Sequence, residues 1–307
     1  MKLTEKLLNP SFPVTFFEVV PPPAAKPDSV EATIAEVRKI KDLVDAINLP
    51  EIHDEDRGTP RTHHFVPRVE PRVLGAGILR DIKTEIVINR CVVYEPDQTT
   101  WFKNTHSEFG IEHVVLVGGE SSKVHYPGPN VMEAAEQVRA AGLPISLGGI
   151  SIPSRPNEAA RIRRKNAAGL DFFTTQVLFD SNDIVGLIQR LSGIEARIFL
   201  SFAPVSHPRD LEVLRWLGVD IPVHLDHFLL RGEKSGAENP SGSAETSFDR
   251  SLDLAQKILM DVFDNLPPDP PCLGLNIEHI NRRNFAPAVQ MLERLSNLYA
   301  GLISARP

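Results

Sequence analysis

Short apolar runs that are typical of buried strands recur along the whole chain, separated by segments with helical periodicity. Most of the runs are unbroken rather than alternating between apolar and polar residues, which is the pattern of parallel strands covered on both faces. This alternation predicts an α/β fold built on a parallel sheet. The eight runs cover residues 14–20, 44–49, 85–93, 113–117, 144–147, 172–179, 197–203 and 272–277.

The segments between these runs have the spacing of amphipathic helices. In the first of them, Val30, Ile34 and Val37 fall on one face. A less regular helix candidate covers about 69–80. The other helical segments cover residues 29–41, 99–109, 131–140, 158–167, 183–191, 208–217, 248–263 and 285–302.

Eight strand-and-helix units in 307 residues match a single (β/α)8 TIM barrel. A doubly wound dinucleotide-binding fold would need a G-x-G-x-x-G turn after the first strand. Pro21-Pro22-Pro23 stands there instead, and proline has no backbone N–H group with which to hold a pyrophosphate. We therefore expect one domain over residues 1–307, with the Gly- and Ser-rich segment at about 232–247 as an exposed loop within it.

The charge and the cysteine content exclude several classes of protein. The formal net charge is −7, whereas proteins that bind nucleic acid usually carry a basic face. Cys91 and Cys272 are too few for a disulfide framework or a Cys-rich zinc site, and they fit a reducing cytoplasm. No apolar run reaches the roughly 20 residues that span a bilayer. We expect a cytoplasmic protein with a small-molecule substrate, and no nucleic acid or membrane as a partner; the oligomeric state is open.

Active sites of this fold form at the C-terminal ends of the strands, which selects a short set of candidate residues. Glu18 stands inside an apolar run, where a desolvated carboxyl group keeps its proton near neutral pH unless a buried basic partner makes it structural. Gln176 offers a donor and an acceptor to the edge of a heterocycle, or is a satisfied core amide. The other side chains selected in this way are Asn48, Glu51, Asn89, Ser201, Phe202, Asn276, Glu278 and Arg282.

Two further positions have both a functional and a structural interpretation. Glu120 follows Gly118 and Gly119, which allow a ligand to approach the backbone, so its carboxylate either binds an N–H pair or lies in a solvated turn. Lys165 belongs to a basic helix face that either contacts a phosphate or is simply solvated.

Histidines and carboxylates gather in residues 52–56 and at His63 and His64. Their spacing matches no helix-borne ligand pair such as H-E-x-x-H, so we expect a solvated polar loop and no metal site. The chain has neither a G-x-S-x-G elbow nor a Walker A loop, which argues against those hydrolases and against P-loop enzymes.

Four stretches in the expected order resemble motifs of the methylenetetrahydrofolate reductase family. They are F-E-V-V-P-P at 17–22, T-Q-V-L-F-D at 175–180, P-V-S at 204–206 and L-N-I-E-H-I-N-R at 275–282. The resemblance runs from about residue 12 to residue 302. It implies a (β/α)8 barrel that reduces the methylene group of 5,10-methylenetetrahydrofolate to a methyl group.

The resemblance also implies roles for single residues. Glu18 would be the general acid that protonates N10 of the folate, and Gln176 would hydrogen-bond the pterin. Arg282 would lie near the folate or the nucleotide, and Lys165 matches a lysine of the family's flavin-binding helix. On this basis the expected substrate-binding residues are Asn89, Glu120, Phe202, Glu278 and Arg282, and the expected cofactor-binding residues are Asn48, Gly118, Gly119 and Lys165.

The departures from the family pattern fall on the flavin site. Val117 replaces the arginine of an R-G-D motif, and N-L-P-E-I-H at 48–53 stands in place of a glycine-rich turn that contacts the flavin phosphates. Asn89 stands where the family often has histidine. Similar losses mark the flavin-independent reductases of the mycobacterial type, which residues 183–186 and 198–202 also resemble. This variant implies direct hydride transfer from NADH or NADPH.

Three alternatives to that interpretation stay open. The first is an FAD-dependent reductase with a divergent flavin site. The second is a barrel that binds a pterin or one-carbon compound for methyl transfer, with a corrinoid protein as a partner. The third is a non-catalytic folate-binding subunit. Bound flavin, dependence on a nicotinamide donor, and turnover distinguish them.

Overall fold

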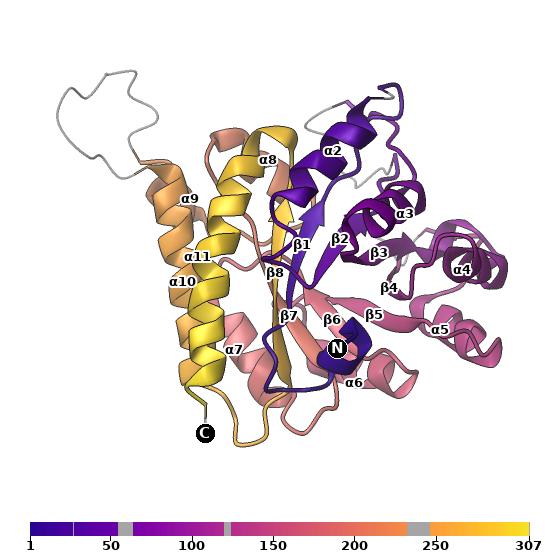
Figure 1. Cartoon of the computed structure of the whole chain (residues 1–307). Helices are drawn as coiled ribbons and strands as arrows, with labels where there is room; N and C mark the ends of the chain where they lie inside the picture. The colour runs from indigo at the N-terminus through magenta and orange to yellow at the C-terminus, as the bar shows by residue number, and fades with distance from the viewer. Residues whose placement is uncertain (27, 55–63, 120–123, 232–245, 307) are drawn as a thin grey trace.

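The strands close into a barrel. The computed structural model describes residues 1–26, 28–54, 64–119, 124–231 and 246–306, apart from the side chain of Arg282. Neighbouring strands pair in parallel in chain order, and β8 pairs with β1, which confirms the predicted (β/α)8 barrel (Figure 1). The strands are β1 (Thr15–Val19), β2 (Ala46–Pro50), β3 (Glu85–Cys91), β4 (His113–Val117), β5 (Ser146–Ser151), β6 (Phe172–Thr175), β7 (Arg197–Phe202) and β8 (Cys272–His279).

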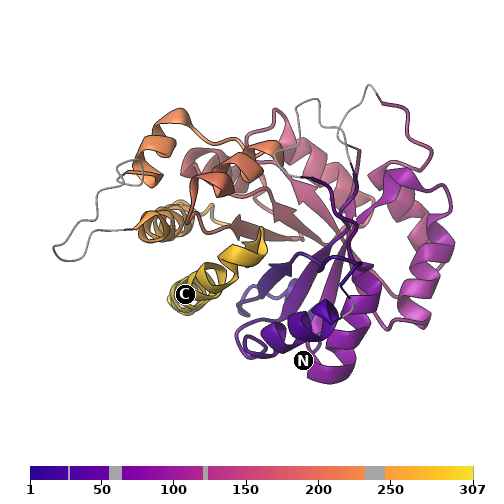
Figure 2. The ribbon, with the colours of Figure 1, turned by 90° about the horizontal axis from the view of Figure 1, so that it is seen from above.

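Helices surround the barrel on its outer side, and a short helix precedes β1 (Figures 1 and 2). None of the described helices is long and apolar enough to cross a membrane. The helices are α1 (Leu3–Leu7), α2 (Ser29–Arg38), α3 (Pro71–Ile82), α4 (Gln98–Ser107), α5 (Val131–Ala140), α6 (Glu158–Ala167), α7 (Ser181–Arg190), α8 (Pro208–Trp216), α9 (Val223–Leu229), α10 (Ser247–Asp264) and α11 (Phe285–Ser304), with 3-10 turns η1 (Val92–Tyr94) and η2 (Arg282–Asn284).

Two predicted strand ends lie four residues from the observed ones, and α1 and α9 were not predicted. The strand predicted over 172–179 ends at Thr175, because the apolar residues that follow it, Val177 and Phe179, pack in a separate cluster with residues of α8 and α9. The strand predicted over 144–147 extends to Ser151 instead, since its two consecutive glycines hide the apolar pattern. The loop predicted at about 232–247 lies mostly outside the described residues.

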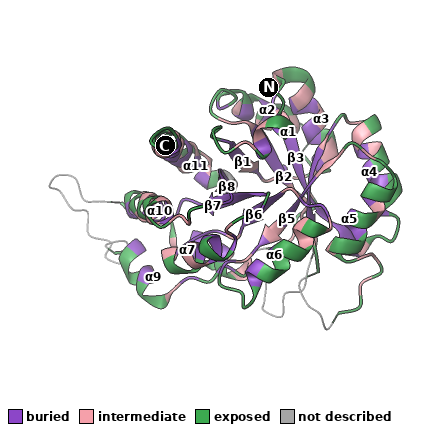
Figure 3. Ribbon diagram, turned by 90° about the horizontal axis from the view of Figure 1, so that it is seen from below, coloured by how far each residue is buried: buried purple, intermediate pink, exposed green. Residues whose placement is uncertain are grey.

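Three phenylalanine rings fill the middle of the barrel. Phe16 stacks on Phe199 at 3.9 Å between ring centroids, and Phe172 meets both rings edge-on. Gly148 and Gly274 make room for them, because a Cβ atom at either glycine would lie 2.4 Å from the ring of Phe172 or Phe199. All three rings are fully buried, as are most residues of the strands (Figure 3).

Arg197 closes the N-terminal end of the barrel. Its fully buried guanidinium donates to the backbone carbonyls of Leu7 (2.7 Å), Lys6 (2.9 Å) and Asn9 (2.7 Å), and to that of Leu273 in β8. Burial lowers the pKa of this arginine. The charge is thus compensated by carbonyl dipoles, and it fastens α1 and the turn after it under the barrel.

Replacing Arg197 by methionine should lower the free energy of unfolding by on the order of 3 kcal/mol, because several buried carbonyls lose a charged donor. Denaturant unfolding measures the change. Arg163→Met is the matched control, since Arg163 also donates to two backbone carbonyls but does so at the exposed surface. We expect that control to cost less than about 1 kcal/mol. Equal losses in the two variants would contradict the role of Arg197.

Candidate active site

The interior of the barrel changes from apolar to polar toward the C-terminal ends of the strands. Alternate side chains of a barrel strand point inward, so the inward position that follows Phe16 in β1 is Glu18, and the one that follows Phe199 in β7 is Ser201. The same step along β2, β3 and β8 places polar side chains above the aromatic rings. Together they form a polar layer made of Glu18, Asn48, Asn89, Ser201, Asn276 and Glu278.

Glu18 lies at the centre of the hydrogen bonds in this layer. Its Oε2 accepts from Nδ2 of Asn48 (3.2 Å) and from Nδ2 of Asn89 (3.4 Å). Glu278 lies beside it, because the two residues are in register in the β1–β8 pair. Asn276 in turn donates to Oε1 of Glu278 (3.4 Å) and to Oγ of Ser201 (3.0 Å).

The two neighbouring carboxyl groups hold protons more tightly than ordinary glutamates do. Burial, and then the charge of Glu278, raise the pKa of Glu18 well above its usual range, against the opposing hydrogen bond from Asn89. Burial raises the pKa of Glu278 to about 7, against a hydrogen bond from Ser201. Two like charges this close and this poorly solvated do not both form near neutral pH. The pair therefore keeps a transferable proton at the open end of the barrel.

Three buried oxygen atoms in the layer have no hydrogen-bond partner among the described residues. They are Oδ1 of Asn48, Asn89 and Asn276, whose amide nitrogens are engaged by Glu18, Glu278 and Ser201. Buried acceptors are rarely left unsatisfied, so this set calls for a ligand or water that presents donors. A ligand with several N–H groups fits this set, together with a proton donor beside it.

Gln176 and Phe202 are not brought into the polar layer. The backbone N–H of Gln176 donates to Ser151 O (2.8 Å), and its side-chain Nε2 donates to the carbonyl of Leu217 at the end of α8 (3.0 Å). Phe202 follows the inward-facing Ser201, so it faces the helices and packs in the outer core. The structure therefore gives Phe202 a packing role, and gives the amide of Gln176 a contact with α8.

The other predicted residues are dispersed. Glu120 lies outside the described residues, and Arg282 begins η2 directly after β8. The side of Gly119 that a Cβ atom would occupy is filled by the ring of Tyr126, only 2.2 Å away. Gly118 is less crowded, with Val131 in ordinary contact at 3.4 Å.

Lys165 turns toward the barrel wall. Its Nζ donates to the carbonyl of Ile150 in β5 (2.8 Å), and burial lowers its pKa in spite of the nearby charge of Glu158. This amine is therefore largely removed from solvent, contrary to a freely solvated basic face.

A second polar group lies at the ends of β2 and β3, where Glu51, a candidate selected from the sequence, meets partners that were not predicted. Glu51 accepts from Nη1 of Arg90 (2.7 Å) and from the backbone N–H of Cys91 (2.9 Å), and it lies 3.3 Å from Nε2 of His53. Burial alone would raise the pKa of Glu51, but His53 and Arg90 together lower it. His53, which was expected in a solvated loop, packs against the ring of Tyr94. Only the pairing of β2 with β3 brings these residues together.

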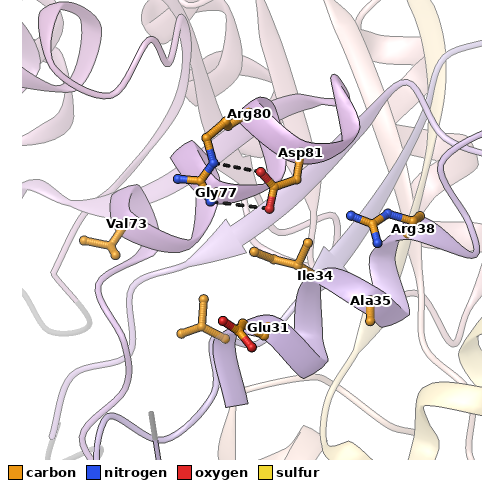
Figure 4. A pocket seen from close by; sticks show the side chains of 9 residues that line it. Glu31, Ile34, Ala35, Arg38, Val73, Gly77, Arg80 and Asp81 are labelled. Carbon is orange, nitrogen blue, oxygen red and sulfur yellow. Dashed lines mark hydrogen bonds and ion pairs between the residues drawn. The ribbon is translucent and has the colours of Figure 1, made fainter. Parts of the chain in front are cut away.

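A surface groove lies away from both groups. It has a volume of about 490 Å³ and lies on the outer surface between α2 and α3, where Ile34 and Val73 meet a rim of charged side chains (Figure 4). Arg80 and Asp81 on that rim are bonded to each other. The groove contains none of the residues predicted for function.

Solved structures share this architecture. No protein-family model and no curated protein matches the chain. An uncharacterized protein from Clostridium thermocellum that binds two copies of 5-methyl-5,6,7,8-tetrahydrofolic acid is 18% identical, with a TM-score of 0.73 over 96% of this chain and 99% of that chain. The dihydropteroate synthase of Xanthomonas albilineans, solved with 4-aminobenzoic acid, is 11% identical, with a TM-score of 0.50 over 98% and 95% of the two chains.

A third solved structure with the same fold is 2,3-dimethylmalate lyase, a member of the PEP mutase/isocitrate lyase superfamily. It is 13% identical, with a TM-score of 0.50 over 96% of this chain and 86% of that chain. At these identities the three likenesses establish the barrel fold.

The raised pKa of Glu278 predicts a pH-dependent loss of stability. Between pH 4.5 and about 7 the unfolded chain ionises this carboxyl group while the folded chain keeps it protonated, so the free energy of unfolding falls with rising pH. Glu278→Gln should therefore be more stable than the wild type above pH 7, by on the order of 2 kcal/mol, and the advantage should vanish near pH 4. Denaturant unfolding across this range measures it.

Glu293→Gln on the exposed side of α11 is the control for that series. Its stability should follow the wild-type curve at every pH. A constant difference between Glu278→Gln and the wild type from pH 4 to pH 8 would show that Glu278 does not carry a raised pKa.

Proposed function

We propose that this protein reduces 5,10-methylenetetrahydrofolate to 5-methyltetrahydrofolate, with NADH or NADPH as the hydride donor and Glu18 as the general acid. The observation that carries the proposal is the buried carboxyl group of Glu18, held by Asn48 and Asn89 in register with Glu278, where burial raises its pKa. The Clostridium thermocellum protein of the same fold binds 5-methyltetrahydrofolate, the product of this reaction.

The proposed reduction requires the protein to supply one proton. Glu18 would donate it to N10 of the folate, so that the bond between N10 and the methylene carbon breaks and an iminium forms at N5. The nicotinamide, when bound, supplies the hydride that the methylene carbon accepts. Glu18 is left as a carboxylate beside Glu278 and regains its proton from solvent through the open end of the barrel.

The buried acceptors suit the other end of the substrate. A reduced pterin presents an exocyclic amino group and ring N–H groups along one edge. The unpartnered Oδ1 atoms of Asn48, Asn89 and Asn276 would accept from such an edge and hold the ring above the phenylalanine layer. Orienting the ring in this way places its N10 side relative to the acid, which is the main task of the enzyme besides protonation.

Two departures of the sequence favour the flavin-independent form of the reaction. Val117 stands where the family has arginine, and N-L-P-E-I-H at 48–53 replaces the glycine-rich turn that contacts the flavin phosphates in the family. Pro50 in this turn has no backbone N–H group to offer a phosphate. Asn48, Gly118, Gly119 and Lys165 stay predicted cofactor contacts, and Nζ of Lys165 also donates to the carbonyl of Ile150.

Methyl transfer from 5-methyltetrahydrofolate is the second candidate. The same acceptor layer would bind the pterin of that substrate, and the Clostridium thermocellum protein and the dihydropteroate synthase share this fold. Methyl transfer needs no nicotinamide. Folate-dependent oxidation of NADH or NADPH by the purified protein therefore distinguishes reduction from transfer.

Glu18→Gln should lower kcat for that oxidation by about 100-fold or more, because glutamine keeps the shape of the side chain but cannot donate the proton. Stopped-flow kinetics measure the rate, and binding of 5-methyltetrahydrofolate by calorimetry should change far less. In the wild type, kcat/KM should fall as the pH rises through the raised pKa of Glu18. Glu293→Gln serves as the control. Full activity of Glu18→Gln would remove Glu18 as the acid.

The purified protein should be colourless, with no flavin absorbance in the visible range. Added FAD should leave the melting temperature unchanged, whereas NADH or NADPH should raise it, since ligands that bind the native state stabilise it. Stoichiometric FAD in the protein as purified would favour the flavin-dependent reductase instead.

A further inference from the structure

Three different metal-binding side chains meet at the ends of β2 and β3. Glu51 and His53 follow β2, and Cys91 is the last residue of β3. One carboxylate oxygen, one imidazole nitrogen and the sulfur all lie within 4.8 Å of one another. From this geometry we propose that Glu51, His53 and Cys91 bind a divalent transition metal ion, with zinc as the best match. This site is separate from the proposed reduction and does not rest on it.

The spacing of the three atoms suits a tetrahedral ion. Ligand atoms that each lie about 2.1 Å from a tetrahedral zinc are about 3.4 Å from one another, and slightly more where one of them is sulfur. The separation between Oε2 of Glu51 and Nε2 of His53 is 3.3 Å. The sulfur of Cys91 lies within 4.8 Å of both atoms, so a shared metal ion would need it to lie slightly closer to them.

The donor set selects the metal. A thiolate, an imidazole and a carboxylate together favour zinc over magnesium or calcium, which prefer oxygen ligands alone. Three protein ligands are typical of zinc sites that leave a coordination position for water or a substrate. The Cys91 thiol loses its proton when the metal binds, so binding releases acid and strengthens with pH.

The surroundings hold the ligands in place. Arg90 is 2% exposed. It donates to Oε1 of Glu51, the carboxylate oxygen that would not bind the metal, and to Glu95 (2.8 Å). The backbone N–H of Cys91 donates to the other oxygen of Glu51. Such outer contacts fix ligand orientation in metal sites. The charges also balance, because Arg90 offsets Glu95 and the two anionic ligands offset the ion.

The site adjoins the polar layer through the backbone. The N–H of Glu51 donates to the carbonyl of Asn89 (3.0 Å), and Asn89 lies two residues before Cys91 on the same strand. An ion bound here would therefore tie together the ends of the two strands that carry Asn48 and Asn89. It would stiffen the position of the amides that hold Glu18.

Metal binding is tested on the full chain without an affinity tag, since histidine tags bind zinc themselves. Chelator-treated protein is titrated with Zn²⁺ against a chromophoric competitor, and with Co²⁺ in an absorption spectrometer. We expect one ion per chain and a thiolate-to-cobalt charge-transfer band in the near ultraviolet. That band reports the sulfur ligand directly and does not depend on enzymatic activity.

Cys91→Ser should abolish the charge-transfer band and weaken zinc binding by about 100-fold or more, and His53→Asn should weaken binding similarly. Cys272→Ser is the matched control, because Cys272 is the other cysteine of the chain and begins β8 at the opposite end of the barrel. It should keep both the band and the affinity. Melting curves show that each variant folds.

Two results would overturn the proposal. One is the absence of stoichiometric binding by the wild type, which would make the cluster an ion-paired group of side chains only. The other is binding that Cys91→Ser leaves unchanged. Melting temperatures give a test that is independent of the spectra. Without metal, Cys91→Ser should melt at the same temperature as the wild type. Added zinc should raise the melting temperature of the wild type but not that of Cys91→Ser.

Discussion

The packing of three phenylalanine rings inside the barrel sets the conditions for the polar layer above them. Phe16, Phe172 and Phe199 pack together in the interior only because Gly148 and Gly274 have no side chain to oppose them. The rings exclude water from below, so the carboxyl groups of the next inward positions are solvated from one side alone. Desolvation is the first cause of the raised pKa of both Glu18 and Glu278.

The amides around those carboxyl groups supply their hydrogen bonds. Asn48 and Asn89 direct their nitrogens to Glu18 and leave their oxygens toward unsatisfied surroundings, and Asn276 does the same beside Glu278. A cation in their place would have ionised the pair. Burial raises the pKa of both carboxyl groups against the hydrogen bond from Asn89, while the neutral amides leave acceptors for a ligand. Acid chemistry and recognition of N–H groups therefore arise in the same layer of side chains.

The fold could be predicted from the sequence because parallel strands that are covered on both faces consist of unbroken apolar runs. Glu18 was readable for a related reason, since a carboxylate interrupting such a run needs an explanation. The neighbourhood of Glu278 was not readable, because it depends on the register of β8 against β1, which pairs residues 260 positions apart. Phe202 faces the helices because it lies one residue after the inward-facing Ser201, and Cys91 acquires its neighbours only when β2 and β3 pair.

The contacts of Arg197 join segments that are far apart in the sequence, so they cannot form early during synthesis of the chain. The carbonyl of Leu7 accepts from a donor that lies 190 residues further along the chain. One edge of β1 stays unpaired until β8 has been made, because β8 is the strand that pairs with it. During synthesis the first strands therefore form an open sheet with an exposed edge, which is the kind of surface that associates wrongly with other chains. Because the donor comes from β7, the contacts that fasten α1 form only after the chain has been made as far as Arg197.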